Sequence, residues 1–299
     1  MSIGSNELAD MKVTFVVPAR NEERDIGGCV DALLVQTGDF AAEIIVVDNG
    51  SIDATAQRAR THGARVVYEE RAGLANARLA GLNAARGEIL VFVDADTRLP
   101  PHWTRDAIAL FDADEKLAGI SPEFRFHDGR VIDDIGNFLF RNFLSPLTNL
   151  VLRATGRPGV LVGSTIAVRT EALRRANGPD PEFQFYGEDT MLAVRLHTQG
   201  DVRFVRQPAL YTSARRYQQR GLLPVVYRYF LVFALIHLGR VQTASRLARR
   251  FHECDRREPG DSRCRAFFSE ALRPHGYGNE TAIMADELTA PEQQLPADA

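Results

Sequence analysis

The sequence predicts an α/β fold: a mostly parallel sheet flanked by helices, followed by a helical extension towards the C-terminus. Short apolar runs alternate with helical segments over the first hundred residues, and this alternation is typical of parallel strands joined by helical crossovers. Polar residues follow several of these runs where each run ends, at the sheet edge where such folds bind their ligands. A long apolar stretch comes late in the chain.

Four short runs are expected as buried strands, because each is rich in β-branched residues and bounded by turn or charged residues. They are VTFVV from Val13, EIIVV from Glu43, ARVVY from Ala64 and EILVFV from Glu88. The segments between them have helical spacing and several Ala and Leu residues, which predicts three helices. These helices are expected over 22–37, 54–62 and 74–86.

The pattern loosens between about residues 98 and 157, where two proline-bounded segments and the aromatic-rich stretch IGNFLFRNFLSPL indicate an inserted helical region. Its aromatic side chains are interpreted as core or lid packing. Beyond it, VLVGSTIAVR from Val160 predicts another strand. GEDTMLAVRLHTQG from Gly187 begins with acidic residues and is expected to continue as a helix.

The composition is that of a foldable chain without a strong charge bias. With 299 residues, 45% of them hydrophobic, the chain can bury a substantial core. Its formal net charge of −3 gives no broad positive field, so no nucleic-acid partner is expected. Cys29, Cys254 and Cys264 lack the spacing of a zinc site or disulfide framework, and the first residues show no signal-peptide pattern. Both observations favour a reducing compartment and a cytoplasmic protein.

The most apolar stretch runs from Leu222 to Gly239. Its length approaches that of a membrane-spanning helix, but Pro224, Arg228 and His237 interrupt it, so it is interpreted as a buried helix or an interfacial membrane helix. The arginine-rich segment after it would suit the anionic inner face of the cell membrane, which favours a peripheral membrane contact. An ordinary packed helix followed by a solvated basic helix is the alternative.

The sharpest local pattern is VFVDADT, in which an apolar strand ends in Asp94-Ala95-Asp96. Two carboxylates just past a buried strand point towards the place where sheets of this kind bind ligands, and their mutual repulsion favours a bound cation. Hard oxygen ligands suit Mg²⁺ or Mn²⁺, which commonly bridge protein carboxylates to substrate phosphates. The motif therefore predicts a divalent metal site at Asp94 and Asp96.

Two earlier strand ends bring polar residues to the same edge. The first strand closes with Pro18-Ala19-Arg20, after which Asn21 is a candidate helix cap. The second ends at Asp48, before Ser51 or Asp53 caps the next helix. Helix capping explains the cap residues, but it does not explain why the three carboxylates Asp48, Asp94 and Asp96 all follow strands.

Five motifs, taken in order, resemble a family 2 glycosyltransferase of the GT-A (Rossmann-like) fold: VVPARNEE, VVDNGSID, RAGLANARLAGLNAARGE, VFVDADT and GEDTMLAVRL. The similarity runs from about Met11 to about Arg220. It implies an inverting enzyme that transfers a sugar from a nucleotide-diphosphate sugar. It also implies a GT-A nucleotide-sugar-binding and catalytic domain over residues 1–220, which leaves a helical extension over 221–288. Residues 289–299 are expected to be a disordered tail because of their Pro, Gln, Ala and acid content.

The resemblance implies roles around the donor nucleotide. Asp48 would accept a hydrogen bond from the base, and Arg71 matches a position near the nucleotide. Asp94 and Asp96, with Ala95 between them, match the acidic motif that binds the nucleotide ribose and the metal. The residues that match the turn around the nucleotide after the first strand are Pro18, Ala19, Arg20 and Glu22.

Glu188 and Asp189 match the family's acidic pair that supplies the catalytic base, and Asp189 is the favoured base. A carboxylate here can take the proton of the acceptor hydroxyl as its oxygen attacks the anomeric carbon, while the metal stabilises the departing diphosphate. Such a direct displacement inverts the anomeric centre. The alternative interpretation is that the two acids only favour a helix N-terminus.

Arg215, Arg216 and Arg220 lie where related enzymes carry a basic segment, or Gln-x-x-Arg-Trp, that closes on the donor diphosphate. Paired guanidinium groups suit a diphosphate. This chain lacks the Trp of the processive synthases, which favours transfer of a single sugar over polysaccharide synthesis. A surface arginine cluster is the alternative.

The donor is expected to be a UDP-sugar, with a GDP-sugar next, and the apolar stretch favours a lipid-linked acceptor of unknown identity. The competing hypothesis is a catalytically inactive nucleotide-binding or membrane-associated scaffold protein of the same fold, and the retained acids count against it. A nucleotidyltransferase would carry a Gly-rich, Lys-containing loop after the first strand, and a dehydrogenase would carry GxGxxG there. This chain has neither.

Overall fold

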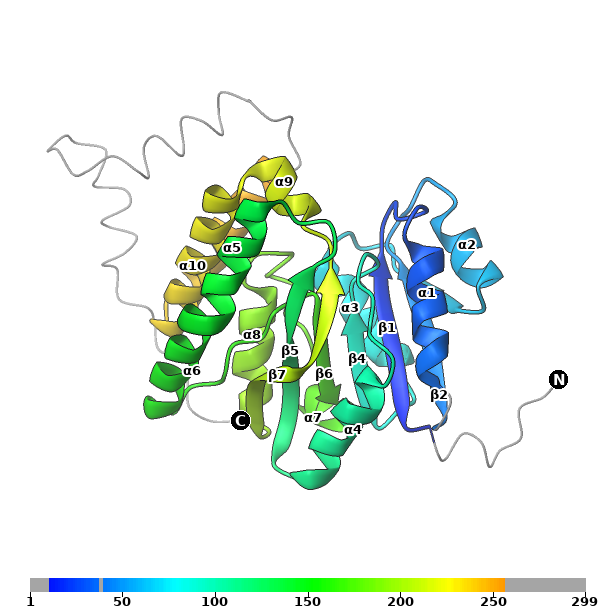
Figure 1. Ribbon diagram of the computed structural model, residues 1–299, viewed down its shortest axis with the longest axis horizontal. Coiled ribbons are helices and arrows are strands. Elements are labelled where there is room, and N and C mark those ends of the chain that lie inside the picture. Colours follow the sequence, from blue (N-terminus) through cyan, green and yellow to red (C-terminus); the bar gives the residue numbers. More distant parts are fainter. Residues whose placement is uncertain (1–10, 38–39, 256–299) are drawn as a thin grey trace, which may run out of the picture.

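The computed structural model describes residues 11–37 and 40–255, which form a seven-stranded sheet with helices on both faces (Figure 1). The strand order is β3-β2-β1-β4-β6-β5-β7. Within these residues only β6 runs antiparallel to its neighbours, so the sheet is mostly parallel, as predicted. The strands are β1 (Val13–Ala19), β2 (Ala42–Asp48), β3 (Arg65–Tyr68), β4 (Ile89–Val93), β5 (Leu117–Phe126), β6 (Thr165–Arg169) and β7 (Asp201–Thr212).

The core lies in two layers, one on each face of the sheet. Successive strand residues point to opposite faces, so Phe15 and Val17 of β1 belong to one cluster and Val16 to the other. The first cluster includes side chains of α1 (Ile26–Leu34), α2 (Thr55–Thr61) and α4 (Trp103–Ala113). The second includes side chains of α3 (Leu74–Ala84), α7 (Thr170–Arg175) and α8 (Glu188–His197). The four N-terminal strands, the three helices between them and α8 are confirmed.

The loops after β1 and β2 are tied to each other, which the sequence interpretation missed. The helix expected from residue 22 begins at Ile26 and is followed by the 3₁₀ turn η2 (Val35–Thr37). Asn21 does not cap it: this residue has a φ of 57°, and its side-chain oxygen accepts the Ile52 backbone N–H at 2.9 Å. The Asn21 N–H in turn donates to Ser51 Oγ at 3.0 Å. The predicted cap role of Asn21 is therefore wrong, and Asp53 rather than Ser51 accepts the first N–H of α2.

Region 98–157 is not wholly helical, contrary to the prediction. It contains α4, α5 (Val131–Leu139), the π-helical turn η3 (Phe140–Leu144) and α6 (Ser145–Ala154), but also the ten-residue strand β5. Pro122 and Glu123 break the apolar run of β5 and hide it from a local pattern. Pro122 lies beside a register shift in the β5–β7 pairing, where a missing N–H is tolerated. The pattern also misses β7, because charged residues interrupt its apolar ones.

Two helices form the described part of the predicted C-terminal extension, α10 (Leu222–His237) and α11 (Val241–Asp255). The short helix α9 (Arg215–Arg220) lies just before them, at the end of the predicted catalytic domain. Side chains of α10 and α11 pack against Phe183 and Tyr186, just ahead of α8. Tyr186 Oη donates to Asp255 Oδ2 at 2.6 Å, and Arg228 of α10 pairs with the same carboxylate. The extension is therefore packed directly onto the sheet's own helices.

No helix in the described part of the chain is long and apolar enough to cross a membrane. The stretch from Leu222 folds as α10, one face of which contributes to the core. The rest of the predicted extension, residues 256–288, and the predicted tail, residues 289–299, lie outside the described residues.

Candidate active site

The predicted acidic motif lies at the carboxyl end of β4, beside the carboxyl ends of β1 and β2. The two carboxylates meet different cations: Asp94 Oδ1 lies 3.6 Å from Arg78 Nη2, and Asp96 Oδ2 lies 3.5 Å from Arg215 Nη2. Ala95 between them is 5% exposed and packs in the core, so only its backbone is available to a ligand.

The surroundings disfavour the charged forms of both carboxyl groups. Although 39% of the Asp94 side chain is exposed, desolvation by the surrounding protein raises its pKa to about 7; Arg78 opposes this rise and Asp96 adds to it. Burial also raises the pKa of Asp96, and the positive charge of Arg215 opposes this rise. A cation bound between these groups would favour their charged forms.

This donor set fits a hard divalent cation that is shared with a substrate. The described residues contain no cluster of three or more His, Cys, Asp or Glu side chains that could hold a metal by itself. Asp94 and Asp96 would therefore leave coordination positions for phosphate oxygens and water, which is the usual arrangement for Mg²⁺. His127, which the sequence interpretation missed, lies beside them, with Nε2 3.4 Å from the Asp96 carbonyl oxygen.

Arg78 of α3 is the main site residue that the sequence interpretation missed. Its side chain is completely buried, and Nη1 lies 2.5 Å from Glu188 Oε2 while Nη2 lies 3.6 Å from Asp94. Nη2 also donates to the Gly163 carbonyl oxygen at 2.5 Å. One guanidinium group thus connects the acidic motif after β4 with the acidic pair of α8.

A signal for Arg78 was present in the sequence. Ala75, Arg78 and Leu82 recur at helical spacing, and all three are buried. An arginine at an apolar position of an amphipathic helix needs a buried anionic partner, because an unpaired buried charge is strongly unfavourable. That partner lies 110 residues away in the sequence, so local spacing alone could not name it.

The structure separates the two acids at the start of α8. Glu188 is 1% exposed and paired with Arg78. Burial raises the pKa of Glu188 to about 7; Arg78 opposes the rise and Asp189 adds to it. Asp189 is less enclosed, and its Oδ1 accepts the Thr190 N–H at 2.8 Å. Burial raises the pKa of Asp189 as well, so Asp189 is the acid of the pair that is not committed to an ion pair with Arg78.

The expected nucleotide turn lies next to Asp48. Pro18 and Ala19 are the last residues of β1 and stand in register with the last two residues of β2, while Arg20 is exposed just beyond them. Asp48 is 8% exposed, and its Oδ1 accepts the Ser51 N–H at 3.0 Å. The ends of β1 and β2 thus bring these predicted residues together.

Arg71 is held near this edge by the side chain of Asn49, to which the sequence interpretation gave no site role. The Asn49 side chain donates to the carbonyl oxygens of Glu69 and Arg71 at 2.9 and 2.8 Å and accepts the Gly73 N–H at 2.8 Å. The Arg71 guanidinium pairs with Glu69 at 2.9 Å, and the side chain is 63% exposed. The structure therefore brings the Arg71 backbone to the loop but leaves its guanidinium on Glu69.

Arg215 reaches from α9 to the acids at the ends of β1 and β4. Its Nη2 lies 3.0 Å from Glu22 Oε1 and 3.5 Å from Asp96 Oδ2, and its Nη1 lies 3.9 Å from Asp25 Oδ2. Burial raises the pKa of Glu22, and the hydrogen bond from Arg215 opposes this. The guanidinium thus partly neutralises an acidic cluster drawn from two loops.

Arg216 and Arg220 both reach Asp255 at the end of α11. Arg220 donates a hydrogen bond to the Asp255 carbonyl oxygen, and Arg216 Nη1 lies 3.8 Å from Asp255 Oδ2. The Arg216 guanidinium carbon also lies 3.5 Å from the centroid of the Phe185 ring, and the charge of Arg216 opposes the rise in the pKa of Asp94. Of the three predicted arginines, Arg215 contacts the acidic motif, Arg216 acts on it by its charge, and both Arg216 and Arg220 hold the end of the extension.

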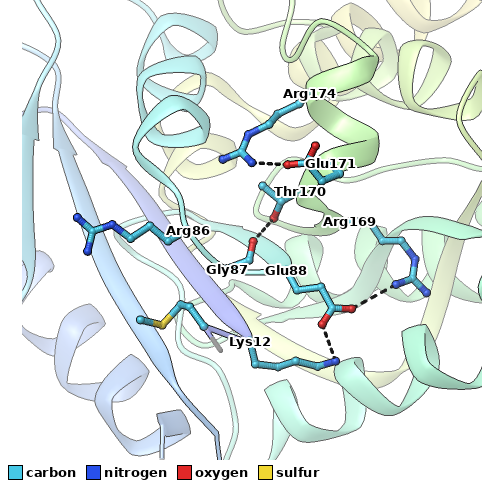
Figure 2. Close-up of a pocket in the computed structure, with 9 residues that line it drawn as sticks. Lys12, Arg86, Gly87, Glu88, Arg169, Thr170, Glu171 and Arg174 are labelled. Carbon is cyan, nitrogen blue, oxygen red and sulfur yellow. Dashed lines mark hydrogen bonds and ion pairs between the residues drawn. The ribbon is translucent and has the colours of Figure 1, made fainter. Parts of the chain in front are cut away.

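Figure 2 shows a pocket at the opposite end of the sheet, where β1 and β4 begin. Lys12 pairs with Glu88 at 2.9 Å there, and Arg169 lies 3.7 Å from the same carboxylate. Thr170 donates to the Gly87 carbonyl oxygen at 2.6 Å. None of the predicted site residues lines this pocket, so it is not the candidate active site.

Comparison with known proteins agrees with the geometry. The sequence profile of glycosyl transferase family 2 matches residues 14–175, more than half of the chain. Glucosyl-3-phosphoglycerate synthase of Mycolicibacterium paratuberculosis is 39% identical over 102 residues, 31% of this chain and 31% of that protein. Glycosyltransferase GlyA of Streptococcus pneumoniae is 38% identical over 94 residues, 30% of this chain and 13% of that protein. The chain spans a third or less of the length of these curated relatives.

Solved structures show the same fold. Glucosyl-3-phosphoglycerate synthase from Mycobacterium tuberculosis, in complex with Mn²⁺, UDP and glucosyl-3-phosphoglycerate, has a TM-score of 0.57 at 24% identity, over 78% of this chain and 82% of that one. TarS residues 1–349 from S. aureus, in complex with UDP-GlcNAc, has a TM-score of 0.55 at 23% identity, over 69% and 59%. The mostly parallel sheet described above is the GT-A fold, and the chain belongs to glycosyl transferase family 2.

Proposed function

We propose that this protein is a metal-dependent, inverting glycosyltransferase that moves one sugar from a nucleotide-diphosphate sugar to an acceptor hydroxyl. The observation that carries the proposal is the buried Arg78, whose guanidinium lies between Asp94 after β4 and Glu188 at the start of α8. One side chain thus connects the expected metal-binding motif with the acidic pair that is expected to supply the general base. Membership of family 2 supports the same chemistry.

A UDP-sugar is the favoured donor, with a GDP-sugar next. The similar solved structures from M. tuberculosis and S. aureus contain UDP and UDP-GlcNAc, respectively, which supports a uridine donor at this edge of the sheet. Asp48, nearly buried at the end of β2, would accept a hydrogen bond from the base. The residues proposed to surround the rest of the nucleoside are Pro18, Ala19, Arg20 and Arg71.

Asp94 and Asp96 would hold Mg²⁺ or Mn²⁺, which when bound stabilises the negative charge of the departing diphosphate. Arg215 and Arg216 would bind the diphosphate oxygens from the other side, since guanidinium groups donate two parallel hydrogen bonds to such anions. Arg215 already lies 3.5 Å from Asp96, so a diphosphate beside that carboxylate is within its reach. Glu22 would hold Arg215 when the diphosphate has left.

Asp189 would act as the general base. Its raised pKa makes its carboxylate more basic than that of an exposed aspartate, which suits proton abstraction from a hydroxyl. As the acceptor proton moves to Asp189, the acceptor oxygen forms its bond to the anomeric carbon from the side opposite the diphosphate, whose bond to that carbon breaks. The configuration therefore inverts. Glu188 would keep the start of α8 in place through Arg78.

The acceptor is proposed to be lipid-linked and to be used at the cytoplasmic face of a membrane. Leu223 and Phe230 on the outer side of α10 are 80% and 61% exposed, which supports an apolar environment for that helix. On this proposal residues 1–220 form the catalytic domain, and the extension over 221–288 approaches the membrane.

The first test is calorimetric titration of UDP, GDP and their sugars, each with and without Mn²⁺, into the wild type and Asp96→Ala. The proposal expects metal-dependent binding of one nucleotide that Asp96→Ala abolishes. Asp112→Ala is the matched control, since Asp112 pairs with Lys12 at the opposite end of the sheet. If no nucleotide bound under any condition, the transferase proposal would be lost and a scaffold role would take its place.

A further inference from the structure

Exposed apolar side chains are concentrated on two neighbouring helical segments. Of the nineteen large hydrophobic side chains that are exposed in the described residues, fourteen lie between residues 131 and 151 or between 223 and 238. Those of α5, η3 and α6 are Val131, Ile132, Ile135, Phe138, Leu139, Phe143, Leu144, Leu147, Leu150 and Val151. Those of α10 and the residue after it are Leu223, Val226, Phe230 and Leu238. We call these fourteen residues the apolar flank.

The two segments lie side by side along the same edge of the molecule (Figure 1). Near the start of each, Leu222 Cδ2 lies 3.0 Å from where a Cβ on Gly136 would stand. Near the end of each, Arg157 donates a hydrogen bond to the His237 carbonyl oxygen. The segments therefore run in the same direction, and their exposed residues belong to one side of the protein.

The outer side of α10 departs from the pattern of an ordinary surface helix. Leu223, Val226 and Phe230 recur at helical spacing on the exposed side, while Val225 and Val232 on the other side are completely buried. A helix that is apolar on all sides is normally covered on all sides. A contiguous exposed patch of this kind on a folded protein marks a site of interaction.

The charge of the same region indicates what kind of surface it binds. The stretches 135–157 and 221–252 contain no Asp or Glu, although the whole chain has a net charge of −3. They contain eight arginines: Arg141, Arg153, Arg157, Arg228, Arg240, Arg246, Arg249 and Arg250. Arg153 and Arg157 are exposed at the end of α6, and Arg240 follows the end of α10. Within the flank, Asp133 is buried and paired with Arg130, and Asp134 is the exposed acid of α5. A mainly apolar region with an excess of arginines fits an anionic surface that also offers hydrocarbon.

We propose that the apolar flank docks on the surface of an anionic lipid bilayer, with α5–α6 and α10 lying in the plane of the membrane–water interface. The flank side chains enter the headgroup boundary, and the exposed Arg153 and Arg157 at the end of α6 meet lipid phosphates. α10 begins two residues after Arg220, at the end of the α9 helix that carries Arg215 and Arg216. Docking therefore brings the candidate active site close to the bilayer surface.

A second copy of the chain fits this surface less well. Dimers of identical chains usually place the same patch of both subunits face to face. In such a contact each copy would bring the exposed Arg153 and Arg157 and the exposed Asp134, so the two facing patches would carry a net positive charge. Like charges held together in this way oppose association.

The test is flotation of the full-length protein with vesicles of phosphatidylcholine alone and of phosphatidylcholine with phosphatidylglycerol. The wild type is expected to float with the anionic vesicles and to be released by high salt. Leu150→Glu and Phe230→Glu should each lower the partition coefficient by about tenfold or more, since each removes an apolar side chain that would enter the bilayer and adds repulsion from the anionic lipid. Val35→Glu on η2, where Val35 is 70% exposed outside the flank, should float like the wild type.

Thermal melts show whether each variant is folded, and Leu223→Glu, at a position 80% exposed, provides a third independent substitution. The proposal is overturned if the wild type fails to float, if it floats equally well with uncharged vesicles, or if the flank substitutions leave flotation unchanged. It is also overturned if light scattering shows a dimer that Leu150→Glu dissociates, because the flank would then be a contact between copies. Flotation requires no turnover, so its failure is distinguishable from failure of the transferase proposal.

Discussion

Charged side chains gather at both ends of the sheet, but they are held in different ways. At the end where β1 and β4 begin, Lys12 pairs with Glu88, and their side chains are 27% and 52% exposed. At the end where β4 finishes, Arg78 and Glu188 pair at 0% and 1% exposure. Water can solvate either member of the first pair when the other is lost, whereas it cannot reach the second pair.

This difference supports the proposal that the carboxyl end of the sheet is the reactive end and the opposite end a structural one. Stability alone does not require buried charges, since a buried ion pair often contributes no more than apolar side chains of the same volume. Carboxyl groups with strongly raised pKa values cluster at functional sites, and the pKa values of Asp94 and Glu188 are both raised to about 7. The raised pKa values at the carboxyl end of the sheet therefore support the proposed active site there.

The largest effect at the reactive end is expected from Asp189→Asn. Loss of the proton acceptor should lower kcat for sugar transfer by about 10²–10⁴-fold. Nucleotide binding should stay near the wild-type value because the side chain keeps its size. Product formation and calorimetric titration measure the two quantities. If turnover were undiminished in this variant, Asp189 would not be the general base.

Arg78→Met should give the largest loss of stability. It leaves Glu188 buried without its cation, at an expected cost of about 3–5 kcal/mol in the free energy of unfolding. Urea denaturation measures this cost. The double variant Arg78→Met with Glu188→Gln should recover part of it, since no uncompensated charge remains at position 188. If the double variant showed no recovery, the two side chains would not be coupled as described.

The pH dependence of stability should differ between the wild type and Glu188→Gln. The folded-state pKa of Glu188, about 7, lies above its ordinary value of 4.5, so the folded protein binds more protons than the unfolded one between these pH values. The wild type should therefore lose stability as the pH rises from about 4.5 to 7. Glu188→Gln should show a smaller loss over this range, measured by urea denaturation at several pH values. Equal slopes would contradict the raised pKa.

The smallest effect is expected at the structural end. Lys12→Met breaks exposed pairs with Glu88 and Asp112 and should change the free energy of unfolding by at most about 1 kcal/mol. Nucleotide binding should be unchanged. A loss as large as that of Arg78→Met would remove the contrast between the two ends.

The elements that the sequence predicted well are those with a strong local signal. β1, β2 and β4 each contain three or more consecutive apolar residues, and the Asp94-Ala95-Asp96 motif stands directly after β4. β5 and β7 were missed because Pro122 and several charged residues break their patterns, and pairing with each other and with β6 overrides the local preference.

The site residues that were missed depend on distant partners. Arg78 meets an acid 110 residues away, and Asn49 holds a segment 20 to 24 residues further on. Asn21 was predicted as a helix cap because caps are the common local use of asparagine. Its actual bonds join two loops 30 and 31 residues apart, which no pattern within one loop could reveal.

The hydrogen bond from Tyr186 to Asp255, and the ion pair of Arg228 with the same carboxylate, limit how this chain can be recombined with its relatives. Tyr186 stands two residues before Glu188, so the last residue of α11 steadies the segment that leads into α8. A chimera joined at residue 220 would keep every motif of the family resemblance. It would lose this contact unless the C-terminal segment taken from the relative also carried an acid at the matching position. Single substitutions within α10 and α11 therefore preserve this contact more readily than exchange of the two helices as a module.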